Sequence, residues 1–192
     1  MHIPLFPLNT VLFPGGPLPL RIFEARYIDM ISERLRADAP FGVVLIREGR
    51  ETGPAATYDV GTLARITDWY QGSDGLLGVT AVGEQRFRVR TAECRHDGLN
   101  VGEVDLLPDE SPVALPESHR GLADIVAAVL DDLGRLYESL ERRYDDAGWV
   151  TWRLIEVLPL ELAQKQACLE RSTVEERLEL VSQVLEAVRK PA

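Results

Sequence analysis

The segment from residue 4 to residue 27, PLFPLNTVLFPGGPLPLRIFEARY, constrains the fold more than any other part of the chain. It is apolar enough for a core, yet it carries five of the 12 prolines and a glycine pair. Proline removes a backbone donor and fixes φ, so neither a long helix nor an uninterrupted central strand is expected here. We expect short strand pieces, LFPL and VLF, with prolines at strand ends or edges and a turn at residues 14–17.

The composition is that of an ordinary globular protein, with 45% hydrophobic and 27% charged residues among 192. No apolar run approaches the roughly 20 residues that span a bilayer. The N-terminus also lacks the basic region of a secretory signal. The sequence therefore predicts a cytoplasmic protein that does not associate with membranes. In such a reducing compartment, Cys94 and Cys168 are expected to be small buried hydrophobic residues.

The charge balance argues against a nucleic-acid partner. The 31 acidic residues outnumber the 21 basic ones, which gives a formal net charge of -10. Such a chain repels phosphate backbones unless its positive charge is concentrated in one patch. The densest basic run is RFRVR at residues 86–90, where strand alternation places the three arginines on one face. A solvated strand face is the simpler interpretation.

The first half of the chain has the pattern of one helix among many strands. Phe23, Tyr27, Ile31 and Leu35 recur every four residues and predict an amphipathic helix that ends near residue 40. A buried strand is expected at residues 41–46, then a loop at 48–59. Four strand-length segments follow, separated by glycine-containing turns and by Gly83-Glu84, and they favour a small barrel or sandwich: VGTLARI, LLGVTAV, QRFRVRTA and LNVGEVDLL.

The second half has only helical patterns. Apolar residues form one helical face between residues 122 and 140, and a second helix is expected at 149–158. Thr173 and Glu176 have the form of a capping box at the start of the last helix. The sequence therefore predicts an α+β protein. Its β-rich subdomain at residues 1–110 includes one helix, and an all-helical subdomain follows at 111–192.

Motifs that carry chemistry are absent from the sequence. It contains no G-x-x-x-x-G-K-[ST] or G-x-S-x-G pattern, and no G-x-G-x-x-G after a strand. His2, His96 and His119 are isolated, without the i+4 partner that aligns metal ligands on a helix. We therefore predict no catalytic, cofactor-binding or metal-binding residues, and no enzymatic activity.

Three segments together resemble one known family. PLFPLNTVLFPGGPLPLRIFEARYIDMI resembles the start of the N-terminal substrate-binding domain of Lon proteases. VGTLARI with GEQRFRV is similar to that family's middle strands, and LPLELAQKQACLERSTVEERLELV to its closing helices. The resemblance covers about residues 3 to 189. It implies a PUA-like β-barrel followed by a helical subdomain, without the ATPase and protease domains of full Lon proteases.

The resemblance implies a non-catalytic module that recognises unfolded or flexible protein segments, either alone or together with a protease machine. Trp69 and Tyr70 are the candidate protein-binding residues, because adjacent aromatic residues in a strand face opposite sides and at least one fits the core poorly. The structural alternative is that one packs inside while the other shields the barrel edge. The oligomeric state stays open.

RNA binding and small-molecule binding are the alternatives to protein binding. PUA-like barrels in other families bind RNA, and here residues 86–90 would supply the positive charge, although a likeness of fold alone is a weak argument. A small molecule could instead occupy a crevice where barrel and helices meet.

Overall fold

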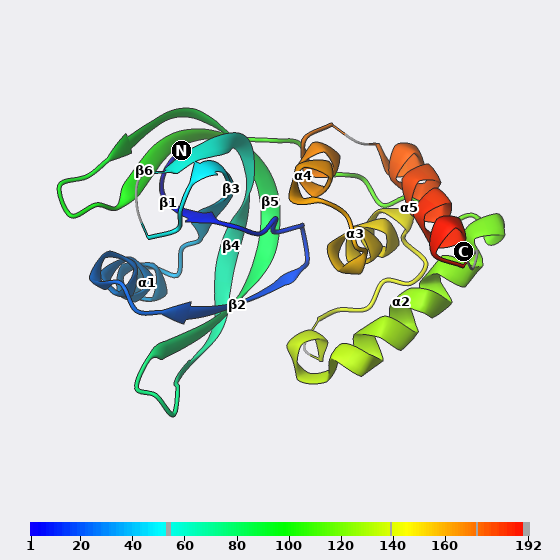
Figure 1. The fold of residues 1–192 in the computed structure, drawn as a ribbon, viewed down its shortest axis with the longest axis horizontal. Coiled ribbons are helices and arrows are strands. Elements are labelled where there is room, and N and C mark those ends of the chain that lie inside the picture. Colours follow the sequence, from blue (N-terminus) through cyan, green and yellow to red (C-terminus); the bar gives the residue numbers. More distant parts are fainter. Residues whose placement is uncertain (53–54, 139, 172, 190–192) are drawn as a thin grey trace. The chain divides into compact units, whose positions relative to one another are not determined.

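A six-stranded sheet that closes on itself forms the N-terminal part of the chain (Figure 1). The structure, a computed structural model, describes residues 1–52, 55–138, 140–171 and 173–189. The strand order is β2-β5-β4-β3-β1-β6, and a further pairing of β5 with β6 closes the ring. The strands are β1 (His2–Leu8), β2 (Pro17–Ile22), β3 (Phe41–Gly49), β4 (Ala55–Gln71), β5 (Leu77–Cys94) and β6 (Asn100–Leu106).

The chain divides into two units, Met1–Asp109 and Glu110–Ala192, called here the β unit and the helical unit. One helix, α1 (Ala25–Ala37), lies among the strands of the β unit. Helices make up the helical unit: η1 (Glu117–His119), α2 (Arg120–Leu133), η2 (Gly134–Tyr137), α3 (Ala147–Val157), α4 (Leu162–Arg171) and α5 (Val174–Arg189). The predicted α+β class, with strands first and helices after them, is confirmed.

The prolines of the opening segment lie where the sheet does not need their missing donors. β1 pairs with β6 through residues 2–5 and with β3 through residues 5–8. Pro4 and Pro7 therefore each lie in a part of β1 that is paired on one side. β2 ends the strand order and pairs with β5 in six consecutive positions. Because that ladder is unbroken, the nitrogens of Pro17 and Pro19 face away from β5.

The segment VLF was predicted to be a strand, and this is wrong. Residues 11–13 are buried but belong to no strand. The Leu12 carbonyl instead accepts a 2.6 Å hydrogen bond from the buried Thr62 hydroxyl. The Phe13 carbonyl accepts from the Gly16 amide at 2.9 Å, which forms the turn expected at residues 14–17. Side-chain and turn hydrogen bonds thus satisfy this backbone without a ladder.

The two strands predicted on either side of Gly83-Glu84 are one long strand, β5. The glycine does not make a turn. It lies next to a register shift in the β4–β5 pairing, and its backbone bonds to both glycines of the preceding turn. A Cβ at Gly83 would lie 2.2 Å from the Phe13 carbonyl oxygen, so the close approach of two backbones requires glycine here. Most of the loop expected at residues 48–59 also belongs to β3 and β4, while residues 53 and 54 lie outside the described residues.

The predicted stripe of α1 is correct only in its middle. Tyr27, Met30 and Ile31 are its buried residues, while Phe23 lies before the helix and is 60% exposed and Leu35 is 40% exposed. A strict four-residue spacing drifts around a helix that has about 3.6 residues per turn, so its ends leave the buried face. The prediction for the cysteines is correct for Cys168, but Cys94 is exposed.

The helical unit has its own hydrophobic core, and its sequence signals for helix ends are only partly followed. The capping box is confirmed, because the Thr173 amide donates to Glu176 Oε2 at 2.8 Å and the Glu176 amide donates to Thr173 Oγ1 at 3.3 Å. The apolar stripe predicted to run from residue 122 to residue 140 breaks at Gly134, where φ is 59°.

Inside the helical unit, the buried guanidinium of Arg177 donates to both carboxylate oxygens of Glu110 and lies 3.6 Å from the centre of the Trp152 ring.

Candidate functional site

A pocket of about 150 Å³ opens on the β unit where β2 leads into α1. Apolar side chains from β1, β2, the start of α1 and the junction between β2 and α1 line most of it: Phe6, Leu8, Pro19, Leu20, Ile22, Phe23 and Tyr27. The charged lining consists of Arg21, Glu24 and Glu51. The opening segment of the sequence therefore supplies two strands of the closed sheet and nearly all of the pocket lining, and both uses require apolar residues.

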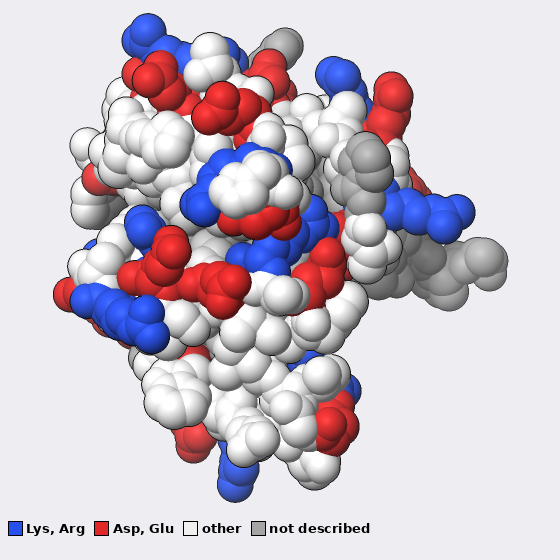
Figure 2. All heavy atoms as spheres, turned by 90° about the vertical axis from the view of Figure 1, so that its left-hand side faces the viewer, with Lys and Arg blue, Asp and Glu red and all other residues white. Residues whose placement is uncertain are grey.

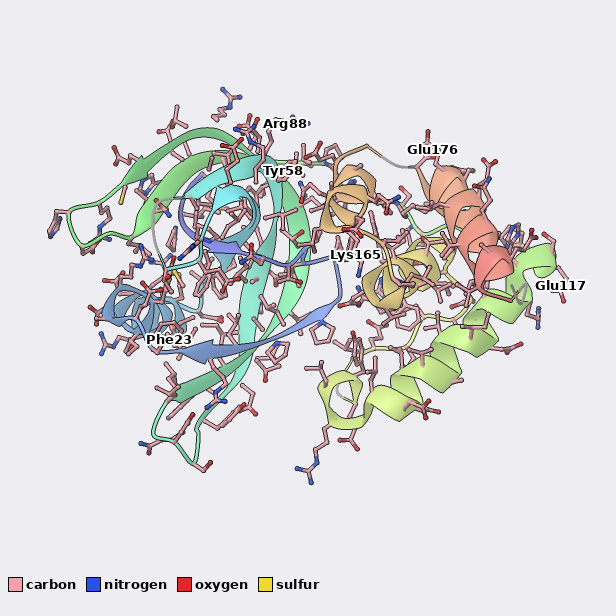
Figure 3. All side chains as sticks on the ribbon, in the orientation of Figure 1. Phe23, Tyr58, Arg88, Glu117, Lys165 and Glu176 are labelled. Carbon is pink, nitrogen blue, oxygen red and sulfur yellow. The ribbon has the colours of Figure 1, made fainter. Side chains whose placement is uncertain are left out.

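Phe23 is the exposed aromatic residue at this pocket. Its side chain lies at the junction of β2 and α1 (Figure 3), between the end of the strand and the N-cap residue Glu24. The residue retains 60% of its surface, which is unusual for a phenylalanine next to an apolar hollow. Sequence reasoning missed it by assigning it to the helix stripe. It lies two residues before the first helical residue, Ala25, and its four-residue spacing to Tyr27 gave no signal of this.

Two stacked aromatic rings line the floor of the pocket. The Phe6 and Tyr27 rings stack with their centres 3.9 Å apart. Burial raises the pKa of the Tyr27 hydroxyl to about 12; the Arg26 charge opposes this rise, while the Glu24 and Glu51 carboxylates add to it. The hydroxyl therefore stays neutral at physiological pH.

Arg26 holds the rim of the pocket in place. Its guanidinium lies 4.6 Å from the centre of the Tyr27 ring and 2.8 Å from the Glu24 carboxylate. It also donates to the carbonyl oxygens of Gly98, at 2.6 Å, and Glu51, at 3.3 Å. Charge-assisted bonds of this kind fix two loops and the start of α1 relative to one another.

Trp69 and Tyr70 both lie in β4, and neither joins the core, with exposures of 60% and 51%. A bulge at Thr67 shifts the register, so Trp69 lies opposite Val79 of β5, which in turn lies opposite Leu20 of β2. Directly opposed residues of antiparallel strands share a face of the sheet. Trp69 therefore shares its face with Leu20, which lines the pocket, at about 10 Å as judged from two strand spacings.

Tyr70 points to the other face of the sheet. It lies opposite Gly78, and a Cβ at that glycine would lie 2.3 Å from Tyr70 Cζ, so the ring covers the glycine backbone. The interpretation in which one of the two aromatics packs inside the barrel does not match this geometry. Sequence alternation correctly separates the two faces, but the bulge that decides which residue faces the pocket leaves no clear sequence signal.

The arginine run alternates as predicted, since Phe87 is buried while Arg88 and Arg90 are exposed. Arg90 forms an ion pair with Asp105 of the neighbouring strand β6, which reduces the positive charge of this face. Figure 3 shows Arg88 at the outer surface of the sheet. On the side of the molecule in Figure 2, basic and acidic side chains are interspersed and do not form one basic patch.

The helical unit contains a buried set of titratable groups. Arg153 Nε lies 3.0 Å from Glu156 Oε2, and Lys165 Nζ donates to the Glu156 carbonyl at 2.8 Å. Burial raises the pKa of the Glu156 carboxyl, lowers that of Arg153 and raises that of the Tyr137 hydroxyl. An acid next to a buried cation has the form of a structural ion pair rather than of an acid/base pair in a cleft.

The parts of the chain that the structure describes show no metal site and no membrane-crossing helix. No group of three or more His, Cys, Asp or Glu side chains there is placed to hold a metal ion. No helix among the same residues is long and apolar enough to cross a membrane.

Comparison with known proteins identifies the fold and the family. The family model of the ATP-dependent protease La (LON) substrate-binding domain matches residues 2–187. The chain belongs to the Lon substrate-binding domain family. The resemblance seen in the sequence is thereby confirmed.

Individual relatives agree with the family model. Lon protease 2 of Myxococcus xanthus is 29% identical over 196 residues, which cover 97% of this chain and 24% of that protein. The crystal structure of a Lon N-terminal domain protein from Xanthomonas campestris is 36% identical, with a TM-score of 0.78, and the match covers 95% of this chain and 98% of that one. The N-terminal domain of the Mycobacterium avium complex Lon protease is 19% identical with a TM-score of 0.64 and covers 97% of this chain and 98% of that one, which shows the shared fold.

The chain spans about a quarter of the length of the curated Lon proteases that it matches. The part that it matches is the substrate-binding domain. Its homology therefore supports a substrate-recognition module of the Lon type.

Proposed function

We propose that this protein is a non-catalytic module that binds exposed apolar segments of other proteins, as a free recognition factor or beside a protease machine. The observation that carries the proposal is the pocket on the β unit, with Phe23 at its rim and Trp69 on the same sheet face as its lining residue Leu20. Exposed aromatic side chains around an apolar hollow are typical of protein-recognition surfaces.

The size of the pocket supports a side chain as the ligand. A volume of about 150 Å³ is small beside the several hundred Å³ of sites that enclose drug-sized molecules. It suits one large apolar side chain, with the rest of the segment lying across the surface. Recognition of single apolar side chains suits unfolded clients, because unfolded protein chains expose apolar side chains in many sequence contexts.

A binding assay with one client in two states tests the proposal. A reduced and alkylated protein that stays unfolded is labelled with a fluorophore, and its fluorescence anisotropy is followed as this protein is added. The native, unmodified form of the same client serves as the comparison. We expect saturable binding of the unfolded form and little binding of the native form. Equal affinity for both forms, or for neither at concentrations well above micromolar, contradicts the proposal.

Two single variants then test the location of the site. Trp69→Ala removes an exposed aromatic from the pocket face, and we expect about tenfold weaker binding of the unfolded client, as is typical of an aromatic anchor. Tyr70→Ala is the matched control, because it removes a neighbouring aromatic of similar exposure from the opposite face. If both variants bind like the unchanged protein, the binding surface lies elsewhere.

Nucleic-acid binding gains no specific support from the geometry of residues 86–90, where Arg90 already has an acidic partner. The cytoplasmic location stays a prediction from the sequence.

A further inference from the structure

The charges around the pocket are unequally compensated. Arg21 forms an ion pair with Asp74, and Glu24 forms one with Arg26 at 2.8 Å, so both of these lining residues have opposite charges beside them. The exposed Glu51 differs, since its Oε1 accepts a 2.7 Å hydrogen bond from the neutral backbone amide of Asn9. Within the described residues, no basic side chain lies at ion-pair distance from the Glu51 carboxylate.

Arg26 does not cancel this charge. Its guanidinium approaches residue 51 at the backbone carbonyl oxygen, 3.3 Å away, while its ion pair is with Glu24. The rim of the pocket therefore carries about one unit of uncompensated negative charge, located at Glu51. Burial raises the pKa of the nearby Tyr27 hydroxyl and the Arg26 charge opposes this rise, while the Glu51 carboxylate adds to it.

We propose that Glu51 makes the pocket select apolar side chains that have a lysine or arginine next to them in the bound segment. This inference rests on the proposed function and adds to it a sequence preference. The apolar side chain enters the pocket, and the neighbouring cation lies at the rim beside the Glu51 carboxylate. An acidic neighbour at the same place is repelled, so acidic segments with the same apolar residue bind more weakly.

Three matched peptides test the preference. Each has a single phenylalanine in a serine- and glycine-rich sequence, with lysine, glutamine or glutamate on both sides of it. Binding is measured by fluorescence anisotropy at low ionic strength. We expect the lysine peptide to bind about two- to fivefold more tightly than the glutamine peptide, as is typical of an exposed ion pair, and the glutamate peptide to bind more weakly than both. High salt reduces these differences.

Glu51→Gln is the decisive variant. Glutamine keeps a side-chain oxygen that can accept the hydrogen bond from the Asn9 amide. The variant therefore retains this contact of residue 51 while it loses the negative charge. We expect this variant to bind the three peptides with nearly equal affinity. Glu103→Gln removes one exposed charge from β6, away from the pocket, and should keep the preference of the unchanged protein.

The outcomes separate this inference from the function on which it rests. If the glutamine peptide binds and the lysine and glutamate peptides bind equally well, the charge preference is wrong and the proposed function stands. A preference that survives in the Glu51→Gln variant likewise overturns the role of Glu51. If no peptide binds while the unfolded client does, the single-side-chain pocket is wrong. If neither binds, the proposed function fails, and this inference fails with it.

Discussion

Phe23→Ala should weaken client binding strongly while leaving the fold almost unchanged. The side chain is 60% exposed, so little of its apolar area contributes to the free energy of unfolding. If a phenylalanine has about 200 Å² of surface, about 120 Å² remains for a bound segment to cover. At about 25 cal/mol per Å², this area corresponds to at most about 3 kcal/mol of binding free energy.

Association also costs conformational and translational freedom, so only part of this free energy is realised. We expect a loss of about 1–2 kcal/mol, which corresponds to roughly five- to thirtyfold weaker binding. Anisotropy titration of the labelled unfolded client measures this loss. Urea denaturation should give an unfolding free energy within about 0.5 kcal/mol of that of the unchanged protein, as is usual for surface substitutions.

Leu106→Ala is the matched control, because Leu106 is 46% exposed on β6 and does not line the pocket. It should bind the client normally. The assignment of the site to the β2–α1 junction is refuted if Phe23→Ala binds as tightly as the control while both remain folded. Equal loss of binding in the two variants would instead indicate non-specific apolar contact.

Three further predictions concern stability. Gly83→Ala should lower the unfolding free energy by about 2 kcal/mol in urea denaturation, because its Cβ would lie 2.2 Å from the Phe13 carbonyl oxygen; an unchanged midpoint would contradict the tight approach. Glu110→Ala should cost about 3 kcal/mol by leaving the buried Arg177 without its bidentate partner, and a loss below about 1 kcal/mol would show that solvent compensates the charge. The pKa of Tyr27 rises from 10.0 to about 12 on folding, so its contribution to stability is complete below pH 10 and is lost as the pH rises toward 12; Tyr27→Phe should reduce this alkaline fall, measured by denaturation across that pH range.

Local patterns in the sequence predict much of this fold. The capping box at Thr173 and Glu176 forms because both partners lie within one helical turn, where no distant residue has to be known. The division into strands and then helices follows for the same reason, since each element has its own hydrophobic period. The prolines of the opening segment correctly indicated positions where backbone donors are not needed.

Features that depend on tertiary contact could not be predicted in this way. Gly83 has the local appearance of a turn residue, yet it continues β5 because a distant turn bonds to its backbone. The face of Trp69 depends on a bulge two residues earlier, which exchanges the two sides of the strand. Phe23 fits the helical period but precedes the helix. The sequence proposed Trp69 and Tyr70 as binding residues, and this stays a prediction, whereas the pocket could be found only from the structure.

The position of Pro17 and Pro19 on the free edge of β2 has a consequence for self-association. A sheet edge with regular donors and acceptors is a template on which another copy of the same chain can add a strand. These prolines remove two donors from the edge of β2 that faces away from β5, and Pro19 also lines the apolar pocket. This edge is thereby hindered from adding a strand of a second copy of the chain. Pro19 thus both lines the pocket and weakens the edge of the sheet as a template for aggregation.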